Sequence, residues 1–275
     1  METTIIVTYV VCDDVIKSLK IKEDPQVKMN LAEVMTTAIM SALQYSGNLE
    51  KARKSLKSSG YIPNMLSKSQ LNRRLHRVGK DVWAAILAEL STEFKKQNFK
   101  NEFIVDSFPV SACKLARIGR NKIYRERKYI GYCASKKEFF LGLKLHMICD
   151  VNGNPVQFTL LPGSESDIGG LRKIDLNLPK NSALIGDKAY NDYKHEDRLV
   201  QEKQIHLLPV RKKNSKRKGG GFLAKIRKRK RKMIETAFSC IEKLMPRSIH
   251  AVTKAGFELK ATLFVLAYAF SKVTF

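Results

Sequence analysis

The spacing of apolar residues changes near residue 100, and this change limits the folds that the chain can adopt. Across residues 31–43 the apolar positions recur every three or four residues, which predicts an amphipathic helix. Across residues 139–149 every second residue is apolar, which predicts a β-strand. We therefore expect an all-helical N-terminal region at residues 1–98 and an α/β region at residues 99–275.

Capping signals separate the helices of the N-terminal region. Asn30 is followed by Glu33, and Ser67 by Gln70, at the spacing of a capping box that begins a helix. The helix predicted from Ser67 to Val78 has a basic outward face that can enter a major groove. An ordinary amphipathic helix is the alternative, because the preceding turn is longer than in a usual helix-turn-helix. The residues of this face predicted to contact DNA are Arg73, Arg74 and Arg77.

After residue 100, the order of predicted elements is that of a mixed sheet with helices on its faces. The predicted strands are 103–108, 139–149, 155–161, 183–185 and 205–210, and the predicted helices are 166–176, 192–202, 228–245 and 257–270. Asn152 and Gly153 form a hairpin signal between the second and third strands. An antiparallel hairpin followed by alternating strands and helices is compatible with an RNase H-like fold.

The chain is strongly basic, which points to a polyanionic partner. Its 51 Lys and Arg against 26 Asp and Glu give a net charge of +25, and folded chains this basic most often bind nucleic acid. Thirteen of the basic residues and no acid fall within 211–232. We expect this segment to be disordered without DNA and to neutralise phosphates when DNA binds. Its residues predicted to contact DNA are Arg211, Lys212, Lys213, Lys216, Arg217, Arg229 and Lys230.

Membrane insertion and disulfide bonds are not expected. The longest apolar stretches, Ile5–Cys12 and Ala261–Phe270, are shorter than the roughly 20 residues that span a bilayer. The five cysteines include no C-x-x-C pair, so we expect them to be small buried side chains in a reducing compartment. The predicted location is therefore the cytoplasm.

Three acids are candidates for chemistry because each lies where a carboxylate is costly. Asp106 interrupts an apolar strand, Asp187 ends another, and Glu235 lies beside the apolar stripe of a helix. Carboxylates that converge repel one another unless a cation neutralises them. Oxygen ligands of this kind hold Mg²⁺, with Mn²⁺ as a substitute. Two such ions about 4 Å apart can activate a nucleophile and stabilise the leaving oxygen of a phosphodiester.

A purely structural role is the alternative for these three acids. Acids at strand ends often cap the next helix or pair with an arginine. Asp150, Asp167 and Glu242 are rival candidates, although Asp150 is expected in a hairpin turn and Asp167 at the start of a helix. On the strand at 139–149, Lys144 and His146 are expected on the face beside the acids, with His146 in a structural role.

Seven segments resemble the DDE transposases of bacterial insertion sequences, closest to the group called nine-eight-two. They are VDSFPV at 105–110, GYCASKK at 131–137, GLKLH at 142–146, GDKAYND at 186–192, RKMIE at 231–235, SIHAV at 248–252 and GFELK at 256–260. The resemblance covers roughly residues 60–275. It implies an RNase H-like catalytic domain, a divalent-metal site, and terminal inverted repeats as substrate. It also implies that Asp106, Asp187 and Glu235 are the catalytic, metal-binding acids.

The last motif region departs from the pattern of the wider class. That pattern is Tyr, two residues, Arg, three residues, Glu, six residues and Lys. Arg231 and Glu235 fit it, but Lys228 stands at the Tyr position and Glu242 at the Lys position. Arg231 lies one helical turn before Glu235, so it is predicted to hold the scissile phosphate, with an ion pair to Glu235 as the alternative.

The sequence thus predicts a transposase that cuts DNA at the ends of an insertion sequence and joins the freed 3′-hydroxyls to target DNA. Lys188, which follows Asp187, is a further predicted DNA contact. Both ends must be handled together, so a homodimer or larger complex on DNA is expected. Two alternatives are a metal-dependent nuclease that only hydrolyses DNA and a DNA-binding protein that has lost catalysis.

Overall fold

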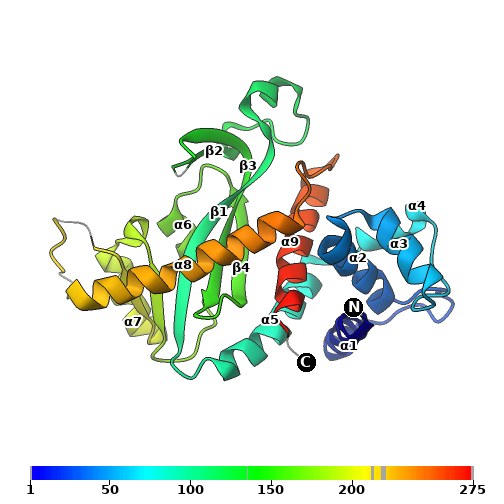
Figure 1. Ribbon diagram of the computed structural model, residues 1–275, viewed down its shortest axis with the longest axis horizontal. Helices are drawn as coiled ribbons and strands as arrows, with labels where there is room; N and C mark the ends of the chain where they lie inside the picture. Colours follow the sequence, from blue (N-terminus) through cyan, green and yellow to red (C-terminus); the bar gives the residue numbers. More distant parts are fainter. Residues whose placement is uncertain (1, 135, 212–213, 218–220, 274–275) are drawn as a thin grey trace. The chain divides into compact units, whose positions relative to one another are not determined.

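The computed structural model in Figure 1 describes residues 2–134, 136–211, 214–217 and 221–273, with the backbone alone at 221–224 and 227–228. The chain divides into two compact units. One unit consists of Met1–Leu90 and Cys240–Phe275, and the other of Ser91–Ser239. The functional division into residues 1–98 and 99–275 stays a prediction.

The first unit is helical. Its elements are α1 (Glu2–Ser18), α2 (Leu31–Tyr45), α3 (Leu49–Ser58), α4 (Lys68–Leu75), most of α5 (Lys80–Gln97), the end of α8 (Gly221–Leu244) and α9 (Lys254–Ser271). Helix α2 is buried along most of its length because it packs against α1, α3 and α9. Both predicted capping boxes are present, with the Asn30 and Ser67 side chains accepting from the backbone of Glu33 and Gln70.

Helix α4 is shorter than predicted. It ends at Leu75 rather than Val78, because Arg77 and Val78 donate to carbonyls three residues earlier in a final tight turn. Arg73 is therefore on the helix, whereas Arg77 lies beyond it.

Within the described residues, no helix is long and apolar enough to cross a membrane.

The second unit contains a mixed six-stranded sheet, as predicted. The strands are β1 (Glu102–Lys114), β2 (Ile130–Cys133), β3 (Glu138–Asp150), β4 (Pro155–Pro162), β5 (Ala183–Gly186) and β6 (His206–Pro209). Their order is β2-β3-β1-β5-β6, and β4 also pairs with β3. The β1–β3, β2–β3 and β3–β4 pairs are antiparallel, whereas β1–β5 and β5–β6 are parallel. This mixed sheet with flanking helices is consistent with the RNase H-like fold.

Strand β1 is longer than predicted and includes a proline. It continues to Lys114 because it pairs with β3 along its whole length. Strand β5 pairs only with Glu102–Ile104, so the rest of β1 has a free edge on that side. Pro109 is tolerated there because a proline without an N–H group is accommodated at a sheet edge. Strand β2 was not predicted from the sequence.

The two faces of β1 meet different helices. Phe108 stacks on Phe238 of α8, with ring centroids 5.3 Å apart, so the side of β1 that includes Asp106 faces α8. Ser107 points to the opposite face, where its hydroxyl donates to Asp167 of α6 (Asp167–Lys173). Helix α8 runs across the strands in Figure 1.

The expected position of His146 beside the acids is wrong. His146 pairs with Ser107 across the ladder, so it lies on the α6 face and is fully buried. Helix α6 approaches so closely that a Cβ built on Gly170 would lie 2.1 Å from the His146 ring nitrogen Nδ1. The sequence pattern could not show that both faces of β3 are covered. Phe139 at its start, by contrast, is 59% exposed.

The hairpin is present as predicted, whereas helix α8 is longer than predicted. At Asn152 and Gly153 the chain turns, and the buried Asp150 carboxylate accepts from the backbone N–H groups of Asn152 and Asn154, as expected for a turn residue. Helix α8 begins at Gly221 rather than near residue 228, so the basic residues 221–232 are helical. Lys and Arg have good helix propensity, which explains why the helix extends through them.

We expect Gly170→Ala to destabilise the protein by about 1–3 kcal/mol, because the added methyl group must displace the His146 ring. Gly119→Ala is the matched control, since nothing lies within 4 Å of a Cβ at that position. Urea unfolding followed by circular dichroism measures both changes. Equal stability of the two variants would contradict the close packing of α6 on β3.

Candidate active site

The sheet brings two of the predicted acids to the same end of neighbouring strands. Strands β1 and β5 are parallel, and Ile104 pairs with Ile185. Asp106 and Asp187 each follow this pair by two residues, so both lie where the short strand β5 ends. The Asp187 side chain accepts from the backbone of Ala189 at 2.7 Å and caps the 3₁₀ turn η3 (Lys188–Tyr190). The carboxyl ends of adjacent parallel strands thereby position two acids.

The third acid comes from α8, whose orientation is set by contacts with the sheet. Phe238 stacks on Phe108 in a nearly parallel arrangement, with an interplanar angle of 24°. Lys230 forms an ion pair with Glu102 at the start of β1. Glu235 lies between these two contacts along α8, and its side chain remains 54% exposed. The helix is therefore fixed against the strand that supplies Asp106.

Arg231 lies among the three acids. Its Nη2 donates to Oε1 of Glu235 at 2.7 Å, and its Nη1 is 3.4 Å from Oδ2 of Asp187. Burial acts to lower the pKa of Arg231, but the hydrogen bond to Glu235 and the charges of Asp106, Asp187 and Glu235 raise it. The ion pair with Glu235, which was the alternative to a phosphate contact, is thus present, and binding of the scissile phosphate by Arg231 stays a prediction. One guanidinium interacts electrostatically with all three predicted catalytic carboxylates.

Burial makes Asp106 unstable as a carboxylate. Burial raises its pKa from 3.8 to about 7, although the Ser107 N–H group and Arg231 both favour the charged form. The carboxylates of Asp187 and Asp167 raise the pKa further. The raised pKa of Asp106 therefore results mainly from its burial away from water, and the neighbouring acids add to it.

Asp167, which the sequence analysis named as a rival candidate and expected at the start of a helix, lies close to the site. It is the first residue of α6, as predicted, and its Oδ1 accepts from the Ser107 hydroxyl at 2.5 Å. The ammonium group of Lys144 is 3.5 Å from the same carboxylate and donates to the Glu165 carbonyl at 2.6 Å. Only the packing of α6 on the sheet reveals this neighbour of Asp106.

Two buried polar side chains lie in the same region without hydrogen-bond partners in the described structure. They are Tyr190, through its hydroxyl, and His146, through both ring nitrogens. Burial, followed by the charges of Asp106, Asp167 and Asp187, raises the pKa of Tyr190. Burial lowers the pKa of His146 to about 4, so its imidazole is neutral at pH 7. His146 therefore cannot supply positive charge to the acids at neutral pH.

The three acids have the oxygen ligands that a divalent cation prefers, although their side chains are not arranged as a preformed metal site. In the described part of the chain, no three His, Cys, Asp or Glu side chains are arranged to hold a metal ion. The candidate donors are nevertheless three carboxylates from β1, the β5 terminus and α8, and such hard oxygen ligands suit Mg²⁺. Burial disfavours the charged form of Asp106, and a cation bound beside it would favour that form.

The predicted DNA-contacting residues fall into two groups. Lys188, Lys216, Arg229, Arg73 and Arg77 are exposed. Arg74, Arg211, Arg217, Arg231 and Lys230 make ion pairs with acids of the protein. Lys212 and Lys213 lie outside the described residues. Contact of each residue with DNA stays a prediction.

The start of the basic segment is attached to α7 (Tyr193–Lys203). Arg211 makes two hydrogen bonds to the buried Glu196 carboxylate, at 2.6 and 2.8 Å, and Arg217 bridges Glu196 and Asp197. Both guanidinium groups also lie over the Tyr193 ring. Their charges are consequently balanced within the protein.

Residues 96–251 match the family model of the transposase DDE domain, which is more than half of the chain. The chain belongs to this transposase family. The matched DDE domain includes the three acids and Arg231, and the resemblance inferred from the sequence motifs is confirmed. Comparisons with curated proteins and with solved structures find no match.

The raised pKa of Asp106 predicts how the stability of the DDE domain depends on pH. The folded protein holds a proton on Asp106 between pH 4 and 7 that the unfolded chain has released, so the free energy of unfolding falls as pH rises through this range. We expect Asp106→Asn to remove this decrease. Between pH 5 and pH 8 the wild type should lose at most about 3 kcal/mol of stability that the variant does not lose.

Thermal melting in a chelator at both pH values measures this effect. Asp24→Asn is the control, because Asp24 lies in an exposed loop, where its carboxylate accepts from the backbone N–H group of Gln26. A pH dependence that is the same in Asp106→Asn and the wild type would contradict the raised pKa.

Proposed function

We propose that this chain is a transposase that cleaves DNA at the ends of an insertion sequence and joins the 3′-hydroxyl ends to target DNA. The observation that supports this most directly is the meeting of Asp106, Asp187 and Glu235 around Arg231 inside the DDE domain. The positive charge of the chain supports DNA as its substrate. Residues 1–98 would recognise the terminal inverted repeats. Arg73 and Arg77 are exposed in this region and would contact the DNA.

The three acids are proposed to hold Mg²⁺, or Mn²⁺ as a substitute. When bound, these ions activate the attacking water or 3′-hydroxyl and stabilise the leaving oxygen of the phosphodiester. Asp106 must be ionised to act as a ligand, so its raised pKa predicts weak metal binding below about pH 7. Asp187 is already oriented by its hydrogen bond from Ala189.

Arg231 is proposed to have two partners in turn. In the described structure it compensates the charge of the acids. A divalent cation held by these acids would take over this compensation, which leaves the guanidinium able to bind the scissile phosphate through two N–H groups. Exposed Lys188 and Arg229 would contact the phosphates on either side. Because both ends of the element must be processed together, we propose a homodimer or larger complex on DNA.

Asp187→Asn is expected to lower cleavage by about a thousandfold, because it removes a metal-binding carboxylate worth several kcal/mol to the transition state. The substrate is a plasmid that contains the gene with its native flanks, incubated with purified protein and Mg²⁺ or Mn²⁺. Asp175→Asn is the matched control, since Asp175 is exposed and pairs with Lys203 on the surface of the same unit.

Each outcome of this assay assigns a function. Metal-dependent breaks at the borders of the gene, joined to a target, support the transposase. Breaks without joining indicate a nuclease, and DNA binding that is the same in both proteins without any cleavage indicates a DNA-binding protein that has lost catalysis.

Arg231→Gln is expected to change metal binding and cleavage in opposite directions. Loss of the guanidinium leaves the acids with uncompensated charge, so Mg²⁺ should bind more tightly, whereas cleavage should fall by about 10–100-fold because the phosphate contact is lost. Calorimetric titration with Mg²⁺ and the plasmid assay measure the two effects. Arg172→Gln is the control, because Arg172 pairs with Asp192 on the surface. A parallel decrease of both quantities would argue against phosphate binding by Arg231.

A further inference from the structure

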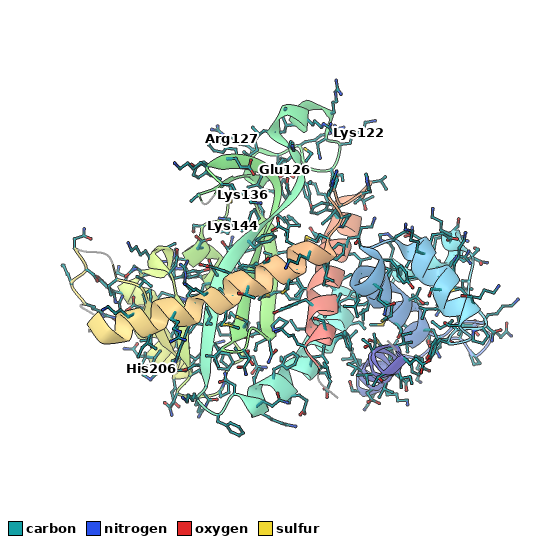
Figure 2. The ribbon with its side chains drawn as sticks, in the orientation of Figure 1. Lys122, Glu126, Arg127, Lys136, Lys144 and His206 are labelled. Atoms are coloured by element: carbon teal, nitrogen blue, oxygen red, sulfur yellow. The ribbon has the colours of Figure 1, made fainter. Side chains whose placement is uncertain are left out.

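A second basic region lies between the ends of β1 and β2. We call residues 114–134 the basic arm. It contains the 3₁₀ turns η1 (Leu115–Arg120) and η2 (Arg127–Tyr129) and strand β2. Its 21 residues include seven Lys or Arg and one Glu. Figure 2 shows Lys122 and Arg127 on the part of the ribbon that projects beyond the strands of the sheet.

Most positive charges of the basic arm are not compensated by the protein. Glu126 pairs with Lys128 at 2.6 Å. The remaining six cations are exposed, and none of them forms an ion pair in the part of the chain that the structure describes. They are Lys114, Arg117, Arg120, Lys122, Arg125 and Arg127. In contrast, Arg211 and Arg217 of the segment after β6 are paired with acids. The basic arm therefore offers free charge that a polyanion can neutralise.

The basic arm is an ordered structure rather than an open loop. Tyr124 and Tyr129 are buried, with ring centroids 4.3 Å apart. The Asn121 side chain accepts from the backbone N–H groups of Ile123 and Tyr124 at 2.9 Å. The Lys128 carbonyl accepts from Ser164, which follows β4. The six cations are thus carried by an ordered backbone that is attached to the sheet at its ends.

Close backbone packing fixes the far end of the basic arm. A Cβ added at Gly131 would lie 2.1 Å from the carbonyl oxygen of Gly163, and one at Gly163 would lie 2.7 Å from the carbonyl oxygen of Tyr129. Glycine is required where two backbones approach this closely. The arm is therefore attached at β1, at β2 and at the residue after β4.

An exposed aromatic pair, formed by Tyr132 of the basic arm and Phe139 of β3, favours nucleic acid over an acidic protein as the partner. Tyr132 on β2 and Phe139 on β3 face each other across the ladder, with ring centroids 5.0 Å apart. Their side chains are 50% and 59% exposed, unlike the buried aromatics that support the arm. Aromatic rings next to unpaired cations are the combination that binds unpaired bases and the phosphates between them.

The distance between the basic arm and the three acids allows one DNA molecule to contact both. Lys114 follows Asp106 by eight residues along β1, which corresponds to about 25 Å of extended strand. Along a DNA duplex this distance equals roughly seven base pairs. One DNA molecule can therefore reach both the acids and the basic arm.

We propose that the basic arm is a second DNA-binding surface, which holds the phosphate backbone through its six exposed cations and stacks unpaired bases on Tyr132 and Phe139. The inference rests on the proposed function only in taking DNA as the substrate. It assigns to this surface DNA that is partly single-stranded.

The cation part of the proposal is tested by salt-dependent binding. The triple variant Arg117→Gln, Arg120→Gln and Lys122→Gln should bind a labelled duplex of about 40 base pairs with a slope of log Kd against log salt that is smaller by about 2–3. The matched control replaces Lys100, Lys180 and Lys194, three exposed lysines of the same unit without ion pairs in the described structure, by glutamine. Equal slopes for the triple variant and the wild type, measured by fluorescence anisotropy, would overturn the proposal.

The aromatic part is tested with DNA that has a short single-stranded tail. Wild-type protein should bind tailed DNA more tightly than blunt DNA, and Phe139→Ser should lose about tenfold of this preference. Phe99→Ser is the control, because Phe99 is an isolated aromatic residue that is 93% exposed in the same unit. An unchanged preference in Phe139→Ser would overturn the assignment of base stacking to this pair.

These measurements are independent of cleavage, since they are made in a chelator. If the wild-type protein cleaves DNA at the borders of the gene and the arm variants bind DNA normally, the proposal for the basic arm is refuted and the proposed function stands. Weakened binding by the arm variants, together with absence of cleavage by the wild type, would support the arm and refute the proposed reaction.

Discussion

The structure around the candidate site depends on electrostatic repulsion between carboxylates and on the single guanidinium that balances it. Asp106, Asp187 and Glu235 come from three elements, and carboxylates brought together disfavour one another's charged form unless a cation compensates them. Arg231 interacts with all three. One cation cannot fully balance three anions, and Asp106 is in addition buried, which is the main cause of its raised pKa. The same imbalance makes the site suitable for a divalent cation, so the contact that stabilises the unliganded fold also prepares the proposed chemistry.

Sheet geometry and helix packing bring these charges together. The parallel register of β1 and β5 places two acids at one edge, and the stacking of Phe108 on Phe238 fixes α8 above them. On the other face of β1, α6 places Asp167 against Ser107. The site is therefore surrounded by acidic and polar groups from both faces of one strand.

Positive charge is used in two ways in this transposase. Arg211 and Arg217 are paired with Glu196 and Asp197 and attach the segment after β6 to α7. The six exposed cations of the basic arm have no such partners in the described structure. Net charge alone does not distinguish these cases, because an arginine in an ion pair releases less free energy on binding phosphate than one that is free. The proposed DNA-binding surface therefore rests on the distribution of unpaired cations rather than on their number.

The sequence by itself determined the local structure and the identity of the candidate acids. Capping boxes, the hairpin at Asn152 and Gly153, the mixed sheet and the positions of Asp106, Asp187 and Glu235 all follow from short-range patterns. The tertiary structure decided which groups lie beside these acids. The burial of His146 under α6, the proximity of Asp167 and the free charge of the basic arm depend on how distant segments pack. Periodicity reports which side of an element is apolar, but it cannot report which element covers that side, because covering is a property of the assembled chain.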